Sequence, residues 1–360
     1  MKFNITLDRD EDGKRIVRDY SFGTITAAYP TGSVVKGATV LAGYSNDAIA
    51  MGQTMIDEPM LLPGGLMKAS LFNRTIGNRV AVNDQTALER SSNVYMFKIA
   101  LAISGNAYER YRGFSVAQED WDTMRNSFAE FGLGVRTGID LPNEGKGVTG
   151  RFIRTEPGTF LDFAIGQYDT YTPLQLLQYV STIANDGYRM QPHVVKEIRQ
   201  PSSDGKTLGA VETVVEPKIL NRINNSQAEI DRVKQGMRMV YTGSNGTARK
   251  YFNDLKYSAA GKTGTAEINY YDDKESPFYT KASVNTTHVG FAPYENPEVA
   301  YAVLIPYITT DPRNVPPASN EIARAALDKY YELKNKEVNE SPSVIKSPAT
   351  DTAVEEGEEN

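Results

Sequence analysis

The chain has 360 residues, of which 40% are hydrophobic and 23% charged, so it lies in the range of soluble globular proteins and is neither collagen-like nor wholly disordered. It contains no cysteine and two histidines, which excludes thiolate metal sites, iron–sulfur clusters, disulfides, cysteine nucleophiles and His-rich metal sites. The net charge is −6, of which −5 falls in residues 335–360, so the nearly neutral body gives no indication of a nucleic-acid surface.

The N-terminus begins with strand-like alternation of Phe3, Ile5 and Leu7, followed by a turn signal at Asp12-Gly13. The sequence has no run of ~18 apolar residues that would form a membrane helix, so the chain as written is expected to be soluble. Because it starts directly on a strand, we expect it to be a portion of a longer protein.

Helical periodicity and capping signals predict helices along the first 240 residues and one near the end. The clearest starts are Thr172-Pro173, typical of an N-cap and first helical position, and the capping box from Ser226 to Glu229. The glycine-rich segment 106–160 is expected to be a loop-rich connection. The predicted helices lie at 33–44, about 94–105, 172–187, from 226 onward, and 319–333.

Residues that favour strands concentrate late in the chain, between Gly, Pro, Asn and Asp. Segments 257–270, 286–291 and 299–308 predict successive antiparallel strands, covered on one face by terminal helices and joined to a large helical middle section. The predicted fold class is α/β of the α+β type. Residues 1–333 are expected to form one domain, and the acidic residues 334–360 a disordered tail.

A serine and a lysine stand three residues apart in Ser33-Val34-Val35-Lys36, at the start of the first predicted helix. Residues at i and i+3 share a helix face, about 5–6 Å apart at Cβ. A lysine whose pKa is lowered by burial or by a neighbouring cation can take the serine's proton and so activate it as a nucleophile. The spacing alone is weak evidence, because the tail contains the same pattern from Ser343 to Lys346.

The triplet Ser91-Ser92-Asn93 places hydroxyls and an amide directly before the second predicted helix. Such residues usually cap helices, so an N-cap at Ser91 or Ser92 is the more ordinary interpretation. The alternative is a second hydroxyl for chemistry at Ser33. The triplet Ser283-Val284-Asn285 shows the same pattern without evident purpose, so this motif is also weak on its own.

The segment Lys262-Thr263-Gly264-Thr265 is the most distinctive in the chain. A phosphate-binding loop of the Walker type would need a glycine where Lys256 stands and a helix after Thr263, whereas strand-like residues follow. A lysine on a strand edge, flanked by small residues that let a peptide backbone lie close, is suited to binding the carboxylate of an added strand.

The histidines do not support a Ser-His-Asp site. His193 follows a proline in a loop, His288 lies within a strand pattern, and the sequence contains no Gly-x-Ser-x-Gly elbow. Both are therefore interpreted as structural residues.

The three motifs occur in the order Ser-x-x-Lys, Ser-x-Asn and Lys-Thr-Gly, which is the signature of penicillin-binding proteins and class A β-lactamases. On these motifs the chain resembles a class B penicillin-binding protein, specifically the penicillin-binding protein 2b subgroup of Gram-positive bacteria. The resemblance covers about residues 20–333. The supporting stretches are Tyr29 to Thr39, Gly138-Ile139-Asp140-Leu141-Pro142, Ala164 to Gln167, Thr172 to Leu176 and Gly246-Thr247-Ala248.

This resemblance implies a fold and a set of site residues. The fold is that of penicillin-binding protein transpeptidases and serine β-lactamases, a central antiparallel sheet flanked by helices with a mostly helical subdomain. Ser33 would be the nucleophile, Lys36 the general base, Ser91 the proton relay to the leaving amine, and Asn93 a support for Lys36 and the substrate amide. Lys262, Thr263, Gly264 and Thr265 would bind the substrate carboxylate, and the backbone N–H groups of Ser33 and Thr265 would form the oxyanion hole.

The resemblance also implies a reaction, partners and a location. The enzyme would release D-alanine from a D-Ala-D-Ala stem peptide of peptidoglycan, form an acyl-serine, and pass the acyl group to an amine of a neighbouring stem peptide. It would be acylated by β-lactam antibiotics, need no metal or organic cofactor, and bind no nucleic acid. It would act at the extracellular face of the cytoplasmic membrane, anchored by an N-terminal segment absent from this chain, with a membrane glycosyltransferase of the elongation machinery as partner.

Other interpretations stay open at this point. A D,D-carboxypeptidase or a β-lactamase-type hydrolase shares the motifs, but a class A β-lactamase needs an added carboxylate to activate water and commonly has Asp where Ser92 stands. A non-catalytic β-lactam sensor domain would resemble class D β-lactamases, which lack the features between Gly138 and Gln167. Because only 32 residues precede Ser33, fewer than the family usually has, the first strands of the sheet are expected to be incomplete.

Overall fold

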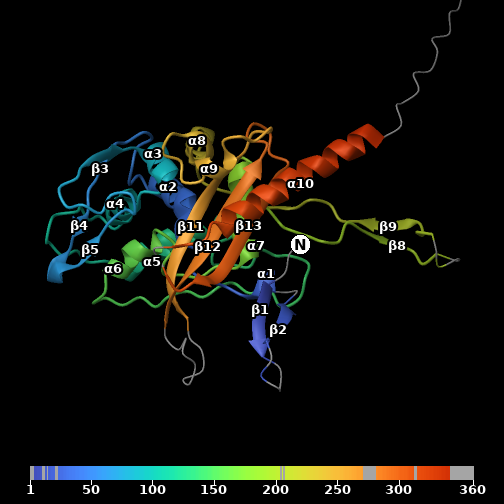
Figure 1. Cartoon of the computed structure of the whole chain (residues 1–360), viewed down its shortest axis with the longest axis horizontal. Helices are drawn as coiled ribbons and strands as arrows, with labels where there is room; N and C mark the ends of the chain where they lie inside the picture. Colours follow the sequence, from blue (N-terminus) through green and yellow to red (C-terminus); the bar gives the residue numbers. More distant parts are fainter. Residues whose placement is uncertain are drawn as a thin grey trace, which may run out of the picture. The chain divides into compact units, whose positions relative to one another are not determined.

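The computed structural model describes residues 4–9, 13, 15–20, 23–202, 205, 207–270, 281–311 and 314–340. Two compact units are present, residues 1–324 and 325–360, and the described part of the second is the continuation of helix α10 (Figure 1). The helices are α1 (Gly23–Thr26), η1 (Gly32–Val35), α2 (Lys36–Ser45), η2 (Pro63–Gly65), α3 (Asp84–Arg90), α4 (Asn93–Ile103), α5 (Gln118–Ala129), α6 (Gly158–Phe163), α7 (Pro173–Ala184), α8 (Gln227–Thr242), α9 (Arg249–Phe252) and α10 (Ala318–Glu340).

Within the described residues the largest sheet has the order β11-β12-β13, and every neighbouring pair is antiparallel (Figure 1). The three late strands predicted from the sequence are therefore confirmed, although β12 begins well before residue 286. Its early part is polar, and those side chains find hydrogen-bond partners inside the protein, which the alternation rule does not anticipate. The strands are β11 (Ala260–Tyr270), β12 (Lys281–Ala292) and β13 (Val299–Thr309).

The other strands pair two by two, away from the largest sheet. In the first pair, β1 opposes β2 from Asn4↔Tyr20 to Arg9↔Arg15, so the predicted N-terminal strand is present but forms a hairpin of its own. Of the predicted turn, Asp12 lies outside the described residues. The remaining pairs are β3 (Met55–Asp57) with β6 (Val80–Val82), β4 (Met60–Leu61) with β5 (Met67–Lys68), β7 (Tyr188–Met190) with β10 (Ile219–Arg222), and β8 (Glu197–Arg199) with β9 (Val211–Val214).

Two predicted helices pack against the sheet. Helix α7 contacts β12 and β13, and α8 contacts β11. Both start as expected: Thr172 caps α7 in a box with Gln175, and Ser226 caps α8 in a box with Glu229. Helix α2 lies among α4, α5 and α8 and is buried on nearly all sides, so it forms the centre of the hydrophobic core.

Residues 106–160 are loop-rich as expected over most of their length, but α5 lies within this segment and α6 begins in it, which was not predicted from the sequence. In α5, the apolar stripe of Trp121, Met124 and Phe128 is buried at helical spacing. The Trp121 ring contacts Phe160 of α6, with centroids 5.2 Å apart. The sequence does not point to this stripe, because the other positions of α5 are mostly Gln, Glu, Asp, Asn and Arg, which give the segment a polar composition.

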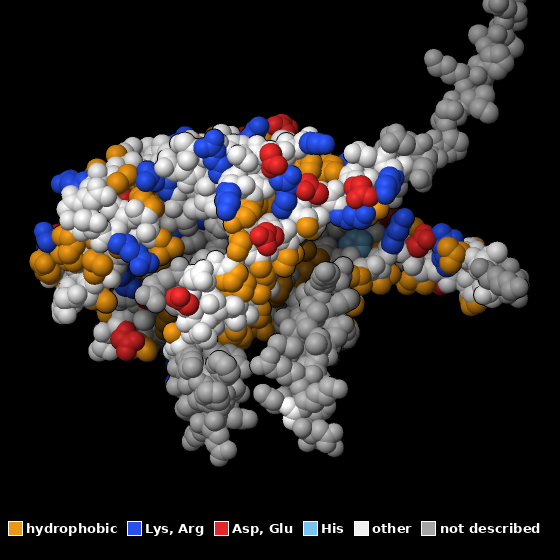
Figure 2. Space-filling view, viewed as in Figure 1, with side chains coloured by type: hydrophobic (Ala, Val, Ile, Leu, Met, Phe, Trp, Pro, Cys, Tyr) orange, Lys and Arg blue, Asp and Glu red, His pale blue; other side chains and the backbone are white. Residues whose placement is uncertain are grey.

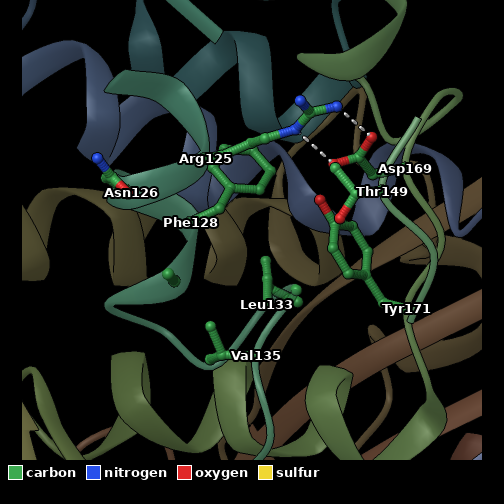
Figure 3. Close-up of a pocket in the computed structure, with 10 residues that line it drawn as sticks. Arg125, Asn126, Phe128, Leu133, Val135, Thr149, Asp169 and Tyr171 are labelled. Carbon is green, nitrogen blue, oxygen red and sulfur yellow. Dashed lines mark hydrogen bonds and ion pairs between the residues drawn. The ribbon is translucent and has the colours of Figure 1, made fainter. Parts of the chain in front are cut away.

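Beside this aromatic cluster, Arg125 of α5 stacks over the Trp121 ring and pairs with the buried Asp169 carboxylate, Nη2 to Oδ1 2.9 Å. Figure 3 shows this ion pair at the edge of a small cavity that Leu133 and Val135 also line. The pair anchors α5 to the strand-like segment before α7.

The C-terminal helix α10 continues past Leu333 to Glu340, so residues 334–340 are helical and the expectation of disorder from residue 334 is wrong there. The sequence after Leu333 has few apolar residues but contains good helix formers, and Glu332 pairs with both Lys329 and Lys336 at i−3 and i+4. Residues 341–360 of the expected tail lie outside the described residues. In the part of the chain that the structure describes, no helix has the length and apolarity needed to cross a bilayer.

Candidate active site

The segment before Ser33 is held by hydrogen bonds from distant parts of the chain. The Asn285 amide of β12 donates to Pro30 O at 3.0 Å, and the Thr287 hydroxyl donates to Thr31 O at 2.6 Å. The N–H groups of Thr31 and Gly32 both donate to Gly166 O, at 3.2 and 2.9 Å. The turn that presents the Ser33 hydroxyl is therefore fixed between the central sheet and the turn that follows α6.

These contacts correct one interpretation of the sequence. The triplet Ser283-Val284-Asn285 was expected to have no purpose, yet Asn285 is fully buried and bonds Pro30 O, while its Oδ1 accepts from Tyr307 N at 3.1 Å. Asn285 thus ties the Ser33 turn to both β12 and β13. No sequence signal points to this role, because Asn285 and Pro30 are 255 positions apart.

Gly32 lies in the left-handed region (φ +62°), and a Cβ there would stand 2.2 Å from Thr265 O. We expect Gly32→Ala to lower the free energy of unfolding by about 2–5 kcal/mol, from backbone strain plus collision with β11, and to slow any reaction at Ser33. The matched control is Gly64→Ala, because Gly64 has φ +73° but a Cβ there would meet no atom within 4 Å, so the cost is the strain of ~1–2 kcal/mol alone. Urea unfolding measures both, and equal losses would contradict the close approach of Gly32 to β11.

Lys36 follows Ser33 as the first residue of α2, and its side chain is fully buried. The amine donates to three oxygens: Ser91 O at 2.8 Å, Ser91 Oγ at 3.1 Å and Asn93 Oδ1 at 2.6 Å. Of these partners, only the Ser91 hydroxyl can also donate, so it can reverse the bond when the lysine is neutral. The arrangement therefore accommodates either protonation state of Lys36.

The Ser91-Ser92-Asn93 turn joins helices α3 and α4, and its two serines have different roles. Ser92 is the N-cap of α4, and its Oγ accepts from Tyr95 N at 3.0 Å, as the ordinary interpretation predicted. Ser91 ends α3 in the left-handed conformation (φ 58°, ψ 47°), which directs its hydroxyl to Lys36. One serine caps the helix and the other belongs to the site.

Lys262 enters the site from β11. Its fully buried amine donates to Ser91 Oγ at 3.0 Å and to Thr263 O at 3.0 Å. The Ser91 hydroxyl therefore lies between two lysine amines, those of Lys36 and Lys262.

Burial shifts the pKa of both lysines downward. The pKa of Lys36 lies well below its ordinary value, chiefly because burial removes water from the amine and secondly because Lys262 is near, while the Asp57 carboxylate opposes the shift. Burial lowers the pKa of Lys262 to about 7. Both causes that the sequence allowed, burial and a neighbouring cation, act on the pKa of Lys36, and burial is the larger.

One cleft brings the predicted residues together. Its lining includes five of them, Ser33, Ser91, Thr263, Gly264 and Thr265. Three more are connected to this lining by the hydrogen bonds above, namely Lys36, Lys262 and Asn93. Gly264 permits the packing beneath, because a Cβ there would lie 2.1 Å from Thr287 Oγ1. The cleft has further walls that sequence reasoning missed: Leu71, Thr247, Tyr251, Thr286, the Val315-Pro316-Pro317 segment, Ser319 and Asn320.

Of these, Thr247 extends the row of hydroxyls, since its Oγ1 lies 2.8 Å from Thr263 Oγ1. The sequence offered a partial signal, because Gly246-Thr247-Ala248 was among the stretches that carried the resemblance. The proline segment and Thr286 gave none. A run of hydroxyls and a lysine along one strand edge is suited to binding a carboxylate.

His288 lies on β12 opposite Thr263, fully buried, with Nε2 2.7 Å from the Tyr241 hydroxyl. Burial lowers its pKa to about 3, so the ring is neutral at pH 7. His193 is exposed and its Nδ1 lies 2.8 Å from Val195 O. Neither histidine lines the cleft that contains Ser33, and both stay interpreted as structural.

The face of the molecule shown in Figure 2 carries lysine, arginine and acidic side chains interspersed over its upper part. No continuous band of positive charge covers this face, in keeping with the nearly neutral body of the chain.

A serine and a lysine at a helix start, a Ser-x-Asn turn and a Lys-Thr-Gly strand around one cleft define a serine–lysine type of site. The chain belongs to the penicillin binding protein transpeptidase domain family, which it matches over residues 5–328. The prediction of a transpeptidase domain of a class B penicillin-binding protein is thereby confirmed.

Among curated relatives, the chain is 44% identical over 330 residues to penicillin-binding protein 2A of Bacillus subtilis, covering 92% of this chain and 45% of that one. It is 35% identical over 316 residues to penicillin-binding protein 2B of Streptococcus pneumoniae, covering 86% and 44%. The solved structure of penicillin-binding protein 2B from strain R6 superposes with a TM-score of 0.81 at 32% identity, covering 91% of this chain and 51% of that one. The predicted fold is confirmed, and the chain spans about half the length of these relatives.

Proposed function

We propose that this domain is a serine-type D-Ala-D-Ala transpeptidase, which cross-links peptidoglycan stem peptides through an acyl-serine and is acylated by β-lactams. The observation that carries the proposal is the Ser91 hydroxyl held between the Lys36 and Lys262 amines, in the cleft that Ser33 lines. Relatives named peptidoglycan D,D-transpeptidase add support at 27–29% identity. We propose residues 1–333 as the transpeptidase domain, in line with the family match.

In the proposed acylation step, neutral Lys36 takes the hydroxyl proton of Ser33. The oxygen forms a bond to the carbonyl carbon between the two D-alanines, and the C=O electron pair moves onto oxygen. The backbone N–H groups of Ser33 and Thr265 stabilise that oxyanion, a contribution typically of ~3–4 kcal/mol per donor. The lowered pKa of Lys36 supports this role, since a base must be neutral to accept a proton.

The proposed intermediate then re-forms its carbonyl and breaks the C–N bond to the terminal D-alanine. The leaving amine takes a proton from the Ser91 hydroxyl, which regains one from the Lys36 ammonium 3.1 Å away. Lys262, Thr263 and Thr265 bind the D-alanine carboxylate, with Gly264 allowing the strand to lie close. Asn93 orients Lys36 through the 2.6 Å bond of its Oδ1 and has its Nδ2 held by Ala69 O.

In the proposed second half, an amine of a neighbouring stem peptide attacks the acyl-serine carbonyl. Ser33 Oγ leaves and recovers its proton through Lys36, and a new amide joins the two peptides. If water attacked instead, the domain would be a carboxypeptidase or β-lactamase.

Intact-mass spectrometry separates these outcomes. With a fluorescent penicillin we expect a one-to-one covalent adduct that persists for hours. With a D-Ala-D-Ala thioester donor and a D-amino acid as the acceptor amine, we expect the amide product to exceed the hydrolysis product. Loss of the adduct within minutes would show a β-lactamase, and hydrolysis unaffected by added amine would show a carboxypeptidase.

We further propose a location and a partner. The domain would act at the extracellular face of the cytoplasmic membrane, next to a membrane glycosyltransferase of the elongation machinery. That such a domain works with a partner protein finds support in one structural neighbour, penicillin-binding protein 2 of Helicobacter pylori, which was solved in complex with MreC and superposes with a TM-score of 0.63 at 25% identity. Copurification of the longer protein from membranes would test the partner.

A further inference from the structure

Asp57 is a fully buried carboxylate at the end of β3, close to the Ser91-Ser92-Asn93 turn but outside the cleft. Its Oδ2 accepts from the hydroxyls of Ser70 and Ser92, both at 2.5 Å, and its Oδ1 accepts from Asn73 Nδ2 at 3.2 Å. These donors are neutral. Burying a carboxylate that has no cation bonded to it costs free energy of folding. If the residue served the fold alone, an amide side chain at this position would cost less.

The serine hydroxyls that donate to Asp57 also bond the residues of the Ser91–Asn93 turn and of helix α4. Ser70 Oγ also accepts from Asn93 N at 2.8 Å and from Val94 N at 3.2 Å, and Ser92 Oγ accepts from Tyr95 N at 3.0 Å. These are N–H groups of the first turn of α4, which have no partners within the helix. Because the carboxylate can only accept, each serine must donate to Asp57 and accept from α4, which fixes the direction of every bond.

Strand β3 is itself fastened to α4. Lys98 Nζ donates to Ile56 O at 2.7 Å, and the Tyr95 hydroxyl donates to Gln53 O at 2.9 Å. The charged groups around Asp57 include Lys36 on α2, Lys262 on β11 and Lys98 on α4, and Glu58 and Arg79 act on Lys98 as well. The Asp57 carboxylate is therefore a negative charge buried behind a site that contains two buried amines.

We infer that Asp57 is a positioning residue for the acyl transfer: through Ser70 and Ser92 it holds the Ser91–Asn93 turn against the Lys36 amine. The inference rests on the proposed function, because it concerns how Lys36 and Asn93 are kept ready for reaction at Ser33. It assigns a role in the reaction to a residue that does not touch the substrate.

Two consequences follow for Asp57→Asn, which keeps the shape of the side chain and removes its charge. The turn loses its strongest acceptor, so the maximal acylation rate should fall about 10-fold or more. Because Asp57 raises the pKa of Lys36 against burial and Lys262, removing its charge lowers that pKa further. Lys36 then stays neutral to lower pH, so the half-maximal pH of the acid limb should fall.

The experiment measures the second-order rate of acylation by fluorescent penicillin from pH 5 to pH 9 for wild type, Asp57→Asn and Asp169→Asn. Asp169 is the matched control, because it is another buried carboxylate but pairs with Arg125 and is not among the charges that act on Lys36. We expect the pH at which acylation is half-maximal to fall for Asp57→Asn and to be unchanged for Asp169→Asn. An unshifted limb in Asp57→Asn, or an equal shift in the control, would overturn the inference.

If Asp57→Asn does not fold, the variant Ser70→Ala tests the same inference about Asp57. This variant keeps the carboxylate but removes the hydroxyl between it and Asn93 N, so acylation should slow about 10-fold with an unchanged half-maximal pH. Acylation at the wild-type rate would overturn the inference. Failure of the proposed function is a separate result, because it appears in wild type itself, as an absent or rapidly lost adduct or as hydrolysis unaffected by added amine.

Discussion

Ser33→Ala is expected to abolish covalent labelling by fluorescent penicillin. Alanine has no oxygen to form the ester, and no other hydroxyl of the cleft has the Lys36 base three residues away on the same helix start. Because Ser33 is partly exposed at the cleft and the substitution removes one atom, the fold should be retained. Gel fluorescence and intact mass after saturating exposure measure the labelling.

The chain offers a matched control for this prediction. Ser343 stands three residues before Lys346, with the same spacing as Ser33 and Lys36. Ser343→Ala should label like wild type, because spacing alone does not make a nucleophile. Undiminished labelling of Ser33→Ala would show that Ser33 is not the nucleophile. Loss of labelling in Ser343→Ala would show that the nucleophile lies in the C-terminal segment.

Lys36→Met is expected to slow acylation by about 10²–10⁴-fold while leaving the protein folded. The variant removes the amine that takes the Ser33 proton but fills nearly the same buried volume. Since the amine is desolvated and beside Lys262, its removal should not destabilise the fold strongly. The residual acylation should also lose the acid limb of its pH profile, because that limb reports protonation of Lys36 below its lowered pKa.

The control for Lys36→Met is Lys234→Met. Lys234 on α8 is also buried, but it bonds Asp186 and Ala184 O and lies outside the cleft. Its loss should affect stability more than acylation. Rapid acylation by Lys36→Met, with the acid limb intact, would show that another group is the base.

The sequence named residues that the structure brings together in one cleft, because each motif combines a functional group with the local structure that presents it. Ser33 and Lys36 share a helix start, and Lys262 lies in a strand-forming run, so the chemistry could be read with the secondary structure. Helix α5, within the loop-rich segment 106–160, was not predicted, for the opposite reason. The three buried positions of α5 are surrounded by polar ones, and only packing against α6 shows which face matters.

By itself, the sequence determined the serine–lysine motifs, the late antiparallel strands and the family, because these depend on residue identity, order and short spacing. Tertiary structure alone decided which serine of the turn faces Lys36, how strongly burial lowers the two lysine pKa values, and which distant groups hold the Ser33 turn. It also joined Asp57 to the site through Ser70 and Ser92. Desolvation and hydrogen bonds between residues far apart in the chain exist only once the fold has formed, and no spacing rule encodes them.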